Sequence, residues 1–69
     1  MKFFRKVRND FEEVNIISDD DGSLYIANAV NTIDVSRPQF IFKENSFIIT
    51  GYTPLKDSFK FISWEFFKK

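Results

Sequence analysis

The sequence predicts an all-β domain, an antiparallel meander of about five strands that closes as a curled sheet or a small barrel. The first reason is composition: Ile, Val, Thr, Phe, Tyr and Trp fill 28 of 69 positions, whereas Ala and Leu occur twice each. The second is the alternation of apolar and polar residues in short runs between turn-forming residues. A chain of this length has room for one domain, residues 1–69, with a core drawn from ten phenylalanines, two tyrosines and one tryptophan.

The N-terminal segment fits two local structures. Its apolar residues recur at the spacing of one helical face, which predicts a short N-terminal helix in a β-dominant α+β fold. The residues on that face are Phe3, Phe4, Val7, Phe11 and Val14. However, Phe3, Arg5 and Val7 also alternate as in a strand, and no clear N-cap residue precedes the helix. Both structures therefore remain open for this segment.

A hairpin follows, in which residues 14–18 and 24–27 form antiparallel strands. The connection Asp19–Ser23 contains an Asp-Gly pair, which is typical of a tight hairpin turn. Residues 32–36 then alternate cleanly and predict an amphipathic strand with Ile33 and Val35 facing inward. We expect this strand to end at Arg37 and Pro38, because proline cannot donate a backbone hydrogen bond.

Residues 39–43 and 46–50 predict a second hairpin around a two-residue loop, Glu44 and Asn45. This loop would pair Phe42 with Phe47 and Phe40 with Ile49, so that one face carries four apolar side chains. The opposite face would carry Ile41 and Ile48. The hairpin is therefore apolar on both faces.

Gly51 and Pro54 predict a loop over residues 51–58. The last predicted strand, residues 59–67, also carries aromatic residues on both faces. One face presents Phe59 and Phe61. The other presents Ile62, Trp64 and Phe66.

The charges form blocks although their formal sum is zero. Residues 1–8 carry four basic groups and no acidic one, and residues 9–36 carry seven acidic groups and no basic one. From Arg37 onward, six basic residues oppose three acidic ones. The blocks either fold into separate patches or interleave on the surface, and a solvated surface is the usual outcome for such blocks.

The residue inventory argues against catalysis. The chain contains no histidine and no cysteine, which removes the commonest general bases, nucleophiles and transition-metal ligands. The acidic run Asp19–Asp21 lacks the ligand spacing of a calcium loop, and we expect it to be a solvated turn. The sequence therefore predicts a protein that is not an enzyme and that needs no cofactor or metal.

Localisation follows from what the N-terminal block lacks. Its basic residues are not followed by an apolar run of signal-peptide length, because Asn9, Asp10, Glu12 and Glu13 interrupt it. No stretch reaches the roughly 18–20 apolar residues of a membrane span. Together with the absence of cysteine, this predicts a cytoplasmic protein that does not enter a membrane.

Apolar residues on both faces of the strands predict a protein-interaction module, either an accessory or inhibitor-like factor or a homo-oligomer. The residues expected to contact a protein partner are Ile41, Ile48, Ile62, Trp64 and Phe66. Alternatively, the N-terminal segment could fold back and cover the second face.

A different class of function, single-stranded nucleic-acid binding, is predicted by the C-terminal strand. Aromatic rings that stack on bases alternate there with lysines that can contact phosphates. The residues of this alternative are Lys60, Phe61, Trp64, Lys68 and Lys69. The zero net charge argues against it.

Overall fold

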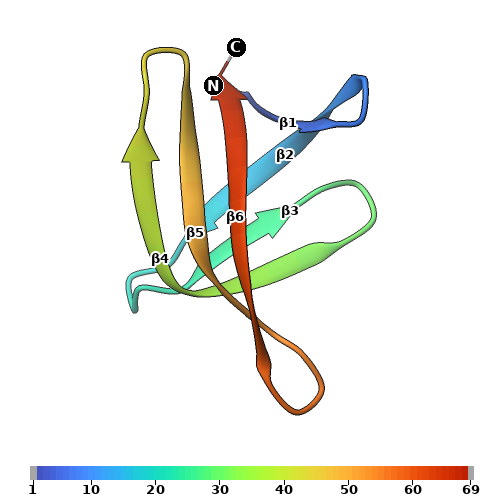
Figure 1. The fold of residues 1–69 in the computed structure, drawn as a ribbon. Helices are drawn as coiled ribbons and strands as arrows, with labels where there is room; N and C mark the ends of the chain where they lie inside the picture. The colour runs from blue at the N-terminus through green and yellow to red at the C-terminus, as the bar shows by residue number, and fades with distance from the viewer. Residues whose placement is uncertain (1, 69) are drawn as a thin grey trace.

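A computed structural model describes residues 2–68 and shows a six-stranded antiparallel meander that closes into a small barrel (Figure 1). Each strand pairs with its neighbours in sequence, and β1 pairs with β6 to complete the barrel. The all-β prediction is confirmed. The strands are β1 (Phe3–Val7), β2 (Asp10–Ser18), β3 (Leu24–Ala27), β4 (Thr32–Phe42), β5 (Ser46–Pro54) and β6 (Phe59–Lys68).

The prediction of an N-terminal helix is wrong, because residues 2–68 contain no helix and the N-terminal segment forms the β1–β2 hairpin instead. The chain reverses at Arg8 and Asn9, between the paired residues Val7 and Asp10. This reversal makes Phe3 and Val14 cross-strand partners that contribute to one core. The helical spacing therefore came from two separate strands, each with its own alternation of apolar residues, on either side of a turn that the sequence does not mark.

The predicted hairpin of β2 and β3 is confirmed by a register that runs from Ser18↔Leu24 to Asn15↔Ala27. In its turn, Gly22 has a φ of 89° and donates its N–H to the Asp19 carbonyl at 3.1 Å. Glycine adopts this left-handed conformation without the steric cost that a Cβ imposes.

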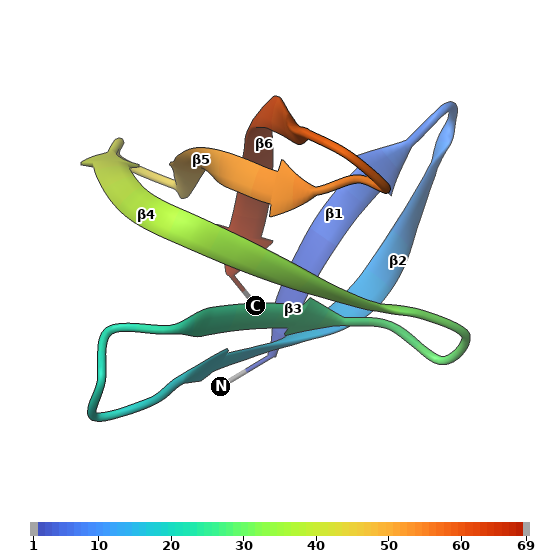
Figure 2. The same cartoon turned by 90° about the horizontal axis from the view of Figure 1, so that it is seen from below.

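Strand β4 is longer than expected, because the two strands predicted on either side of Arg37 and Pro38 are one. The register changes from Ser36↔Tyr52 to Gln39↔Thr50, so three steps along β4 match two along β5. This β-bulge absorbs the proline, and Arg37 adopts a φ of 53° within it. The bulge bends β4 from its pairing with β3 to its pairing with β5 (Figure 2).

The predicted pairs of the β4–β5 hairpin are confirmed, namely Phe40↔Ile49, Ile41↔Ile48 and Phe42↔Phe47. The loop predicted for residues 51–58 is wrong over its first half, because β5 continues to Pro54 and pairs with β6 as far as Phe59. Only residues 55–58 form the connection. Gly51 was misinterpreted as a loop signal, whereas it lies buried where β5 passes close to the bulge of β4.

The core lies between the β4–β5–β6 side of the barrel and the β1–β2–β3 side. Its centre is aromatic: the ring of the fully buried Phe66 lies 5.7 Å from that of Phe47, and Phe3 meets Phe47 edge to face at 5.5 Å. Such ring pairs add to the free energy gained by burying their area. The buried apolar residues are Val14, Leu24, Ile26, Val35, Phe47, Ile49, Ile62 and Phe66.

Candidate functional site

The residues predicted to contact a protein partner divide between core and surface. Ile62 and Phe66 are buried in the core, so they cannot form part of an exposed contact surface. Trp64 is half-buried beneath the Arg5 guanidinium. Ile41 is 52% exposed on the outer face of β4, opposite the half-buried Ile48 of β5. The N-terminal segment does not cover this face, because β1 extends the barrel at the far edge of β6.

The outer face of the β5–β6 hairpin carries the first candidate surface, which we call the hairpin aromatic surface: Arg37, Tyr52, Phe59 and Phe61. The register pairs Tyr52 with Phe61 and places Phe59 opposite Pro54. Tyr52, Phe59 and Phe61 are 41%, 64% and 57% exposed. The rings of Tyr52 and Phe61 meet edge to face at 5.5 Å.

Arg37 borders the aromatic rings because the β4 bulge redirects the chain beside β5. An open hollow of about 440 Å³ is lined by Ser36, Arg37, Tyr52 and Phe59. A guanidinium and two aromatic rings therefore meet at one place on the surface. The prediction missed Arg37 and Tyr52 because residues 37–38 were interpreted as a strand end and residue 52 as part of a loop.

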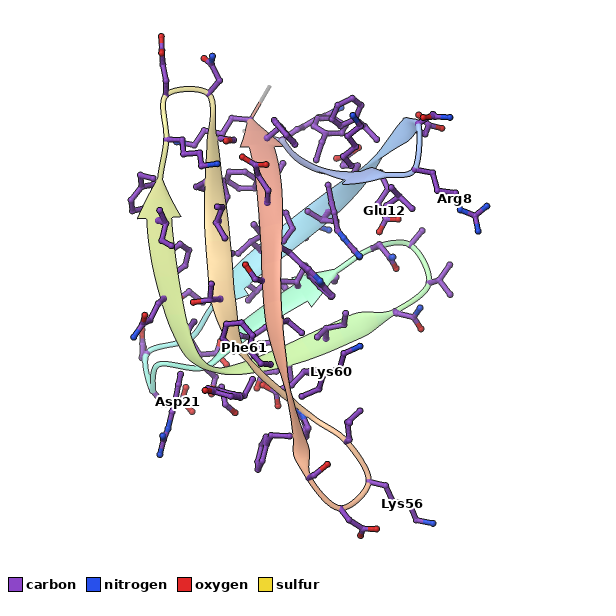
Figure 3. The ribbon with its side chains drawn as sticks, viewed as in Figure 1. Arg8, Glu12, Asp21, Lys56, Lys60 and Phe61 are labelled. Atoms are coloured by element: carbon purple, nitrogen blue, oxygen red, sulfur yellow. The ribbon has the colours of Figure 1, made fainter. Side chains whose placement is uncertain are left out.

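The structure separates the residues of the nucleic-acid alternative. Lys60 and Phe61 lie near the loop that joins β5 to β6 (Figure 3), whereas Lys68 ends the same strand beside Phe3 of β1. Eight residues of a strand span about 26 Å, so Lys60 and Lys68 cannot contact the same nucleotide. The Lys68 ammonium lies 5.7 Å from the centre of the Phe47 ring. Lys69 lies outside the described residues.

A third feature is an aromatic groove at one end of the barrel. Phe42 and Phe40 stack on each other at 5.9 Å, and both rings adjoin Phe47. With Phe3, Ile16 and Lys68, these rings line an open groove of about 270 Å³. Phe40 and Phe42 were predicted to share one face of the hairpin with Phe47 and Ile49. The two rings lie on this face, but the end of β4 extends past the closed part of the barrel and leaves them exposed.

Two carboxylates have perturbed acidities, each with a local cause. The Ser46 hydroxyl donates to Glu65 Oε2 at 2.7 Å, which lowers the pKa of Glu65, and Lys43 lies 3.4 Å from the same oxygen. The backbone N–H of Ser23 donates to Asp21 Oδ1 at 2.9 Å and lowers the pKa of Asp21. The acidic turn at residues 19–21 thus uses one of its carboxylates to hold its own backbone.

Comparison of the chain with protein-family models, with curated proteins and with solved structures found no match. Within residues 2–68, no group of three or more His, Cys, Asp or Glu side chains is placed to hold a metal ion. The same residues include no helix that is long and apolar enough to cross a membrane.

Proposed function

We propose that the protein is a non-enzymatic interaction module that binds a protein partner through the hairpin aromatic surface. The observation that carries this proposal is the grouping of three exposed aromatic rings beside Arg37 on one outer face. Tyrosine and arginine are among the residues that contribute most to binding energy when a partner covers them. Folded monomers seldom expose such a group of aromatic rings to water, and an exposed group of this kind is typical of an interaction site.

The chemistry of the chain supports the non-enzymatic part of the proposal. A general base or nucleophile at neutral pH is most often histidine or cysteine, and the sequence contains neither. The rings at the hairpin surface are rigid and need little ordering on contact, which favours recognition of another folded surface. The partner is either a different protein or a second copy of this chain docking through the same face.

The test is an affinity capture with the tagged protein, performed with and without nuclease. The variant is the double substitution Phe59→Ser and Phe61→Ser, which removes two exposed rings and leaves the core untouched. The matched control is Ile17→Ser, which removes an exposed apolar side chain from the outer face of β2. We expect the wild type and the control to retain a partner protein in stoichiometric amount after nuclease treatment, and the double variant to lose it.

Light scattering distinguishes the two kinds of partner. A homo-oligomer would have a mass above that of the monomer, and the double variant would return it to the monomeric mass. The proposal is wrong if the wild type is monomeric and retains no protein, or if the double variant retains the same partner as the wild type.

A further inference from the structure

A separate surface lies along the seam where β1 meets β6 and closes the barrel. Among the described residues, the two strands pair only from Phe3↔Lys68 to Arg5↔Phe66. Past Arg5 they diverge, and an open hollow of about 400 Å³ lies beside them. We call it the seam hollow. Its lining includes Arg5, Lys6 and Arg8 on one side and Ser63, Trp64 and Phe67 on the other.

The fold concentrates positive charge at this hollow. The basic block of residues 1–8 supplies Arg5, Lys6 and Arg8, and the closure of the barrel places them beside residues 63–67 of β6. Within residues 2–68 the one ion pair is Lys43 with Glu65. The three cations of the hollow therefore have no carboxylate of residues 2–68 within 4 Å. Net charge alone conceals this local excess.

The acidic groups near the hollow are engaged elsewhere or lie on the neighbouring strand. Glu65 also lines the hollow, but its carboxylate binds the Ser46 hydroxyl and Lys43. Glu12, the cross-strand neighbour of Arg5, accepts a hydrogen bond from the Asn28 side chain at 2.7 Å. Asp10 and Glu13 belong to β2 and do not line the hollow.

Arg5 is held in a geometry that suits an anion. Its guanidinium carbon lies 4.0 Å from the centre of the Trp64 ring, and the side chain is half-buried. Stacking on a ring fixes the guanidinium plane and leaves N–H donors at its edge. A phosphate can accept two such donors at once.

Aromatic rings continue from the cations along the outer face. Phe67 lines the seam hollow and meets Phe11 edge to face at 5.6 Å. Lys6 is the cross-strand partner of Phe11. Phe67 also lines an adjoining hollow of about 260 Å³ together with Phe4, Phe11 and Lys68. Cations and rings thus alternate over a continuous stretch of surface, which is the arrangement that binds phosphates and bases together.

The backbone at Arg8 adds an independent indication. Arg8 has a φ of 60° in the β1–β2 turn, where glycine or asparagine is the usual residue. The left-handed conformation costs a residue with a Cβ about 1–2 kcal/mol. An arginine at this position gives up stability while placing its charge at the seam hollow.

We propose that the seam hollow binds the phosphate backbone of a single-stranded nucleic acid, with bases packing against the rings of Phe67 and Phe11. Arg5, Lys6 and Arg8 contact the phosphates, and Arg5 is pre-oriented by Trp64. This site lies apart from the hairpin aromatic surface and does not depend on the partner proposed there. It retains Trp64 from the sequence prediction and replaces Lys60 and Phe61 with the cations of β1 and of the turn that follows it. Lys68 lines the adjoining hollow.

The test uses Trp64 fluorescence, because this is the single tryptophan of the chain. An oligothymidylate of about ten nucleotides, the site size of a small β domain, is titrated into the intact protein at low salt. We expect quenching of the emission and an affinity that falls with salt. Three phosphate contacts on a single strand predict a slope of log K against log salt of about −2.

The variants are Arg8→Gly, which also relieves the backbone strain, and Lys6→Gln on an exposed side chain. Each should weaken binding about fivefold at low salt and reduce the slope by about 0.7. The urea midpoint should be maintained in Lys6→Gln and should not fall in Arg8→Gly. The control is Lys56→Gln, in the loop between β5 and β6 at the opposite end of the molecule (Figure 3). It should bind as the wild type does.

Three results would overturn the proposal. The first is unchanged Trp64 emission at saturating oligothymidylate and low salt. The second is an equal loss of affinity in Lys56→Gln and Lys6→Gln, which would indicate non-specific attraction. The third is binding of a duplex of the same length as tightly as the single strand, since paired bases cannot pack on Phe67 and Phe11.

Discussion

Replacing Gly51 with alanine tests the closest approach of two strands in the barrel. Gly51 is buried opposite the β4 bulge, and a Cβ built on it would lie 2.4 Å from Val35 Cγ1 and 2.9 Å from the Ser36 carbonyl oxygen. Both distances are below any ordinary contact, and the second atom belongs to the backbone. Among the glycines of the chain, Gly22 alone has a positive φ. The strain expected from an alanine at position 51 therefore comes from lack of space for its Cβ and not from the backbone conformation.

The expected cost follows from these contacts. Forcing one carbon into a filled core costs about 3 kcal/mol at the upper end of the usual range. Alanine also lowers the conformational entropy of the unfolded chain, which offsets about 0.5–1 kcal/mol of this cost. The free energy of unfolding should therefore fall by about 2 kcal/mol. At about 0.05–0.15 kcal/mol per residue, the whole domain has about 3–10 kcal/mol. Gly51→Ala thus removes a large share of its stability.

The assay is urea unfolding monitored by Trp64 fluorescence. With a slope of about 1 kcal/mol per molar urea for a small domain, the midpoint should fall by about 2 M. Val35→Ala removes the Cγ1 atom that the new Cβ would meet. The double variant should therefore lose less than the sum of the two single variants, by at least about 1 kcal/mol. A Gly51→Ala midpoint within error of the wild type, or strict additivity in the double variant, would refute the reasoning.

Four further substitutions test other contacts. Asn28→Ala removes the Oδ1 acceptor of the Val30 and Asn31 N–H groups, at 2.9 and 2.7 Å, and should cost about 1–2 kcal/mol in urea unfolding. Ser46→Ala removes the hydroxyl that lowers the pKa of Glu65. A carboxyl group whose pKa is lowered in the folded state stabilises the fold at pH values above its pKa in the unfolded state, which is near the ordinary 4.5. This stabilisation is lost as the pH falls through the pKa of the folded state. The midpoint difference between Ser46→Ala and the wild type should therefore shrink between about pH 7 and about pH 3. Phe66→Ala, in the centre of the core, should cost about 3–5 kcal/mol and leave a largely unfolded circular dichroism spectrum, whereas the exposed Phe59→Ala should change stability by less than about 0.5 kcal/mol.

Local pairing was predictable where two apolar runs flank a short turn and fit no other local structure. The register of Phe42 and Phe47 followed from the two-residue loop between them, because the pairs that it sets place apolar side chains opposite one another on both faces. The turn at Arg8 and Asn9 gave no such signal, because the apolar residues around it, from Phe3 to Val14, also fit the spacing of one helical face. Pro38 falsely indicated the end of a strand, because a bulge accommodates a proline that a regular ladder of hydrogen bonds would exclude.

The surfaces were less predictable because they depend on contacts between distant parts of the chain. Strand alternation placed Phe59 and Phe61 correctly on the face opposite Ile62 and Phe66. The contact between Arg5 and Trp64 joins the first strand to the last. No periodicity within either strand indicates that they are neighbours. The basic N-terminal block was visible as a charge run, but only barrel closure shows what it lies beside.

The same closure makes the domain suitable for insertion into other chains. Phe3 and Lys68 are directly paired on neighbouring strands, so the two ends of the described chain lie side by side (Figure 1). Residues paired in this way have Cα atoms about 5 Å apart. A surface loop of a host protein could therefore carry the whole barrel on two short connections with little distortion. Equally, a peptide bridge across this gap would allow the chain to be reopened at Lys56 and Asp57, giving a circular permutant with the same six strands in a new order.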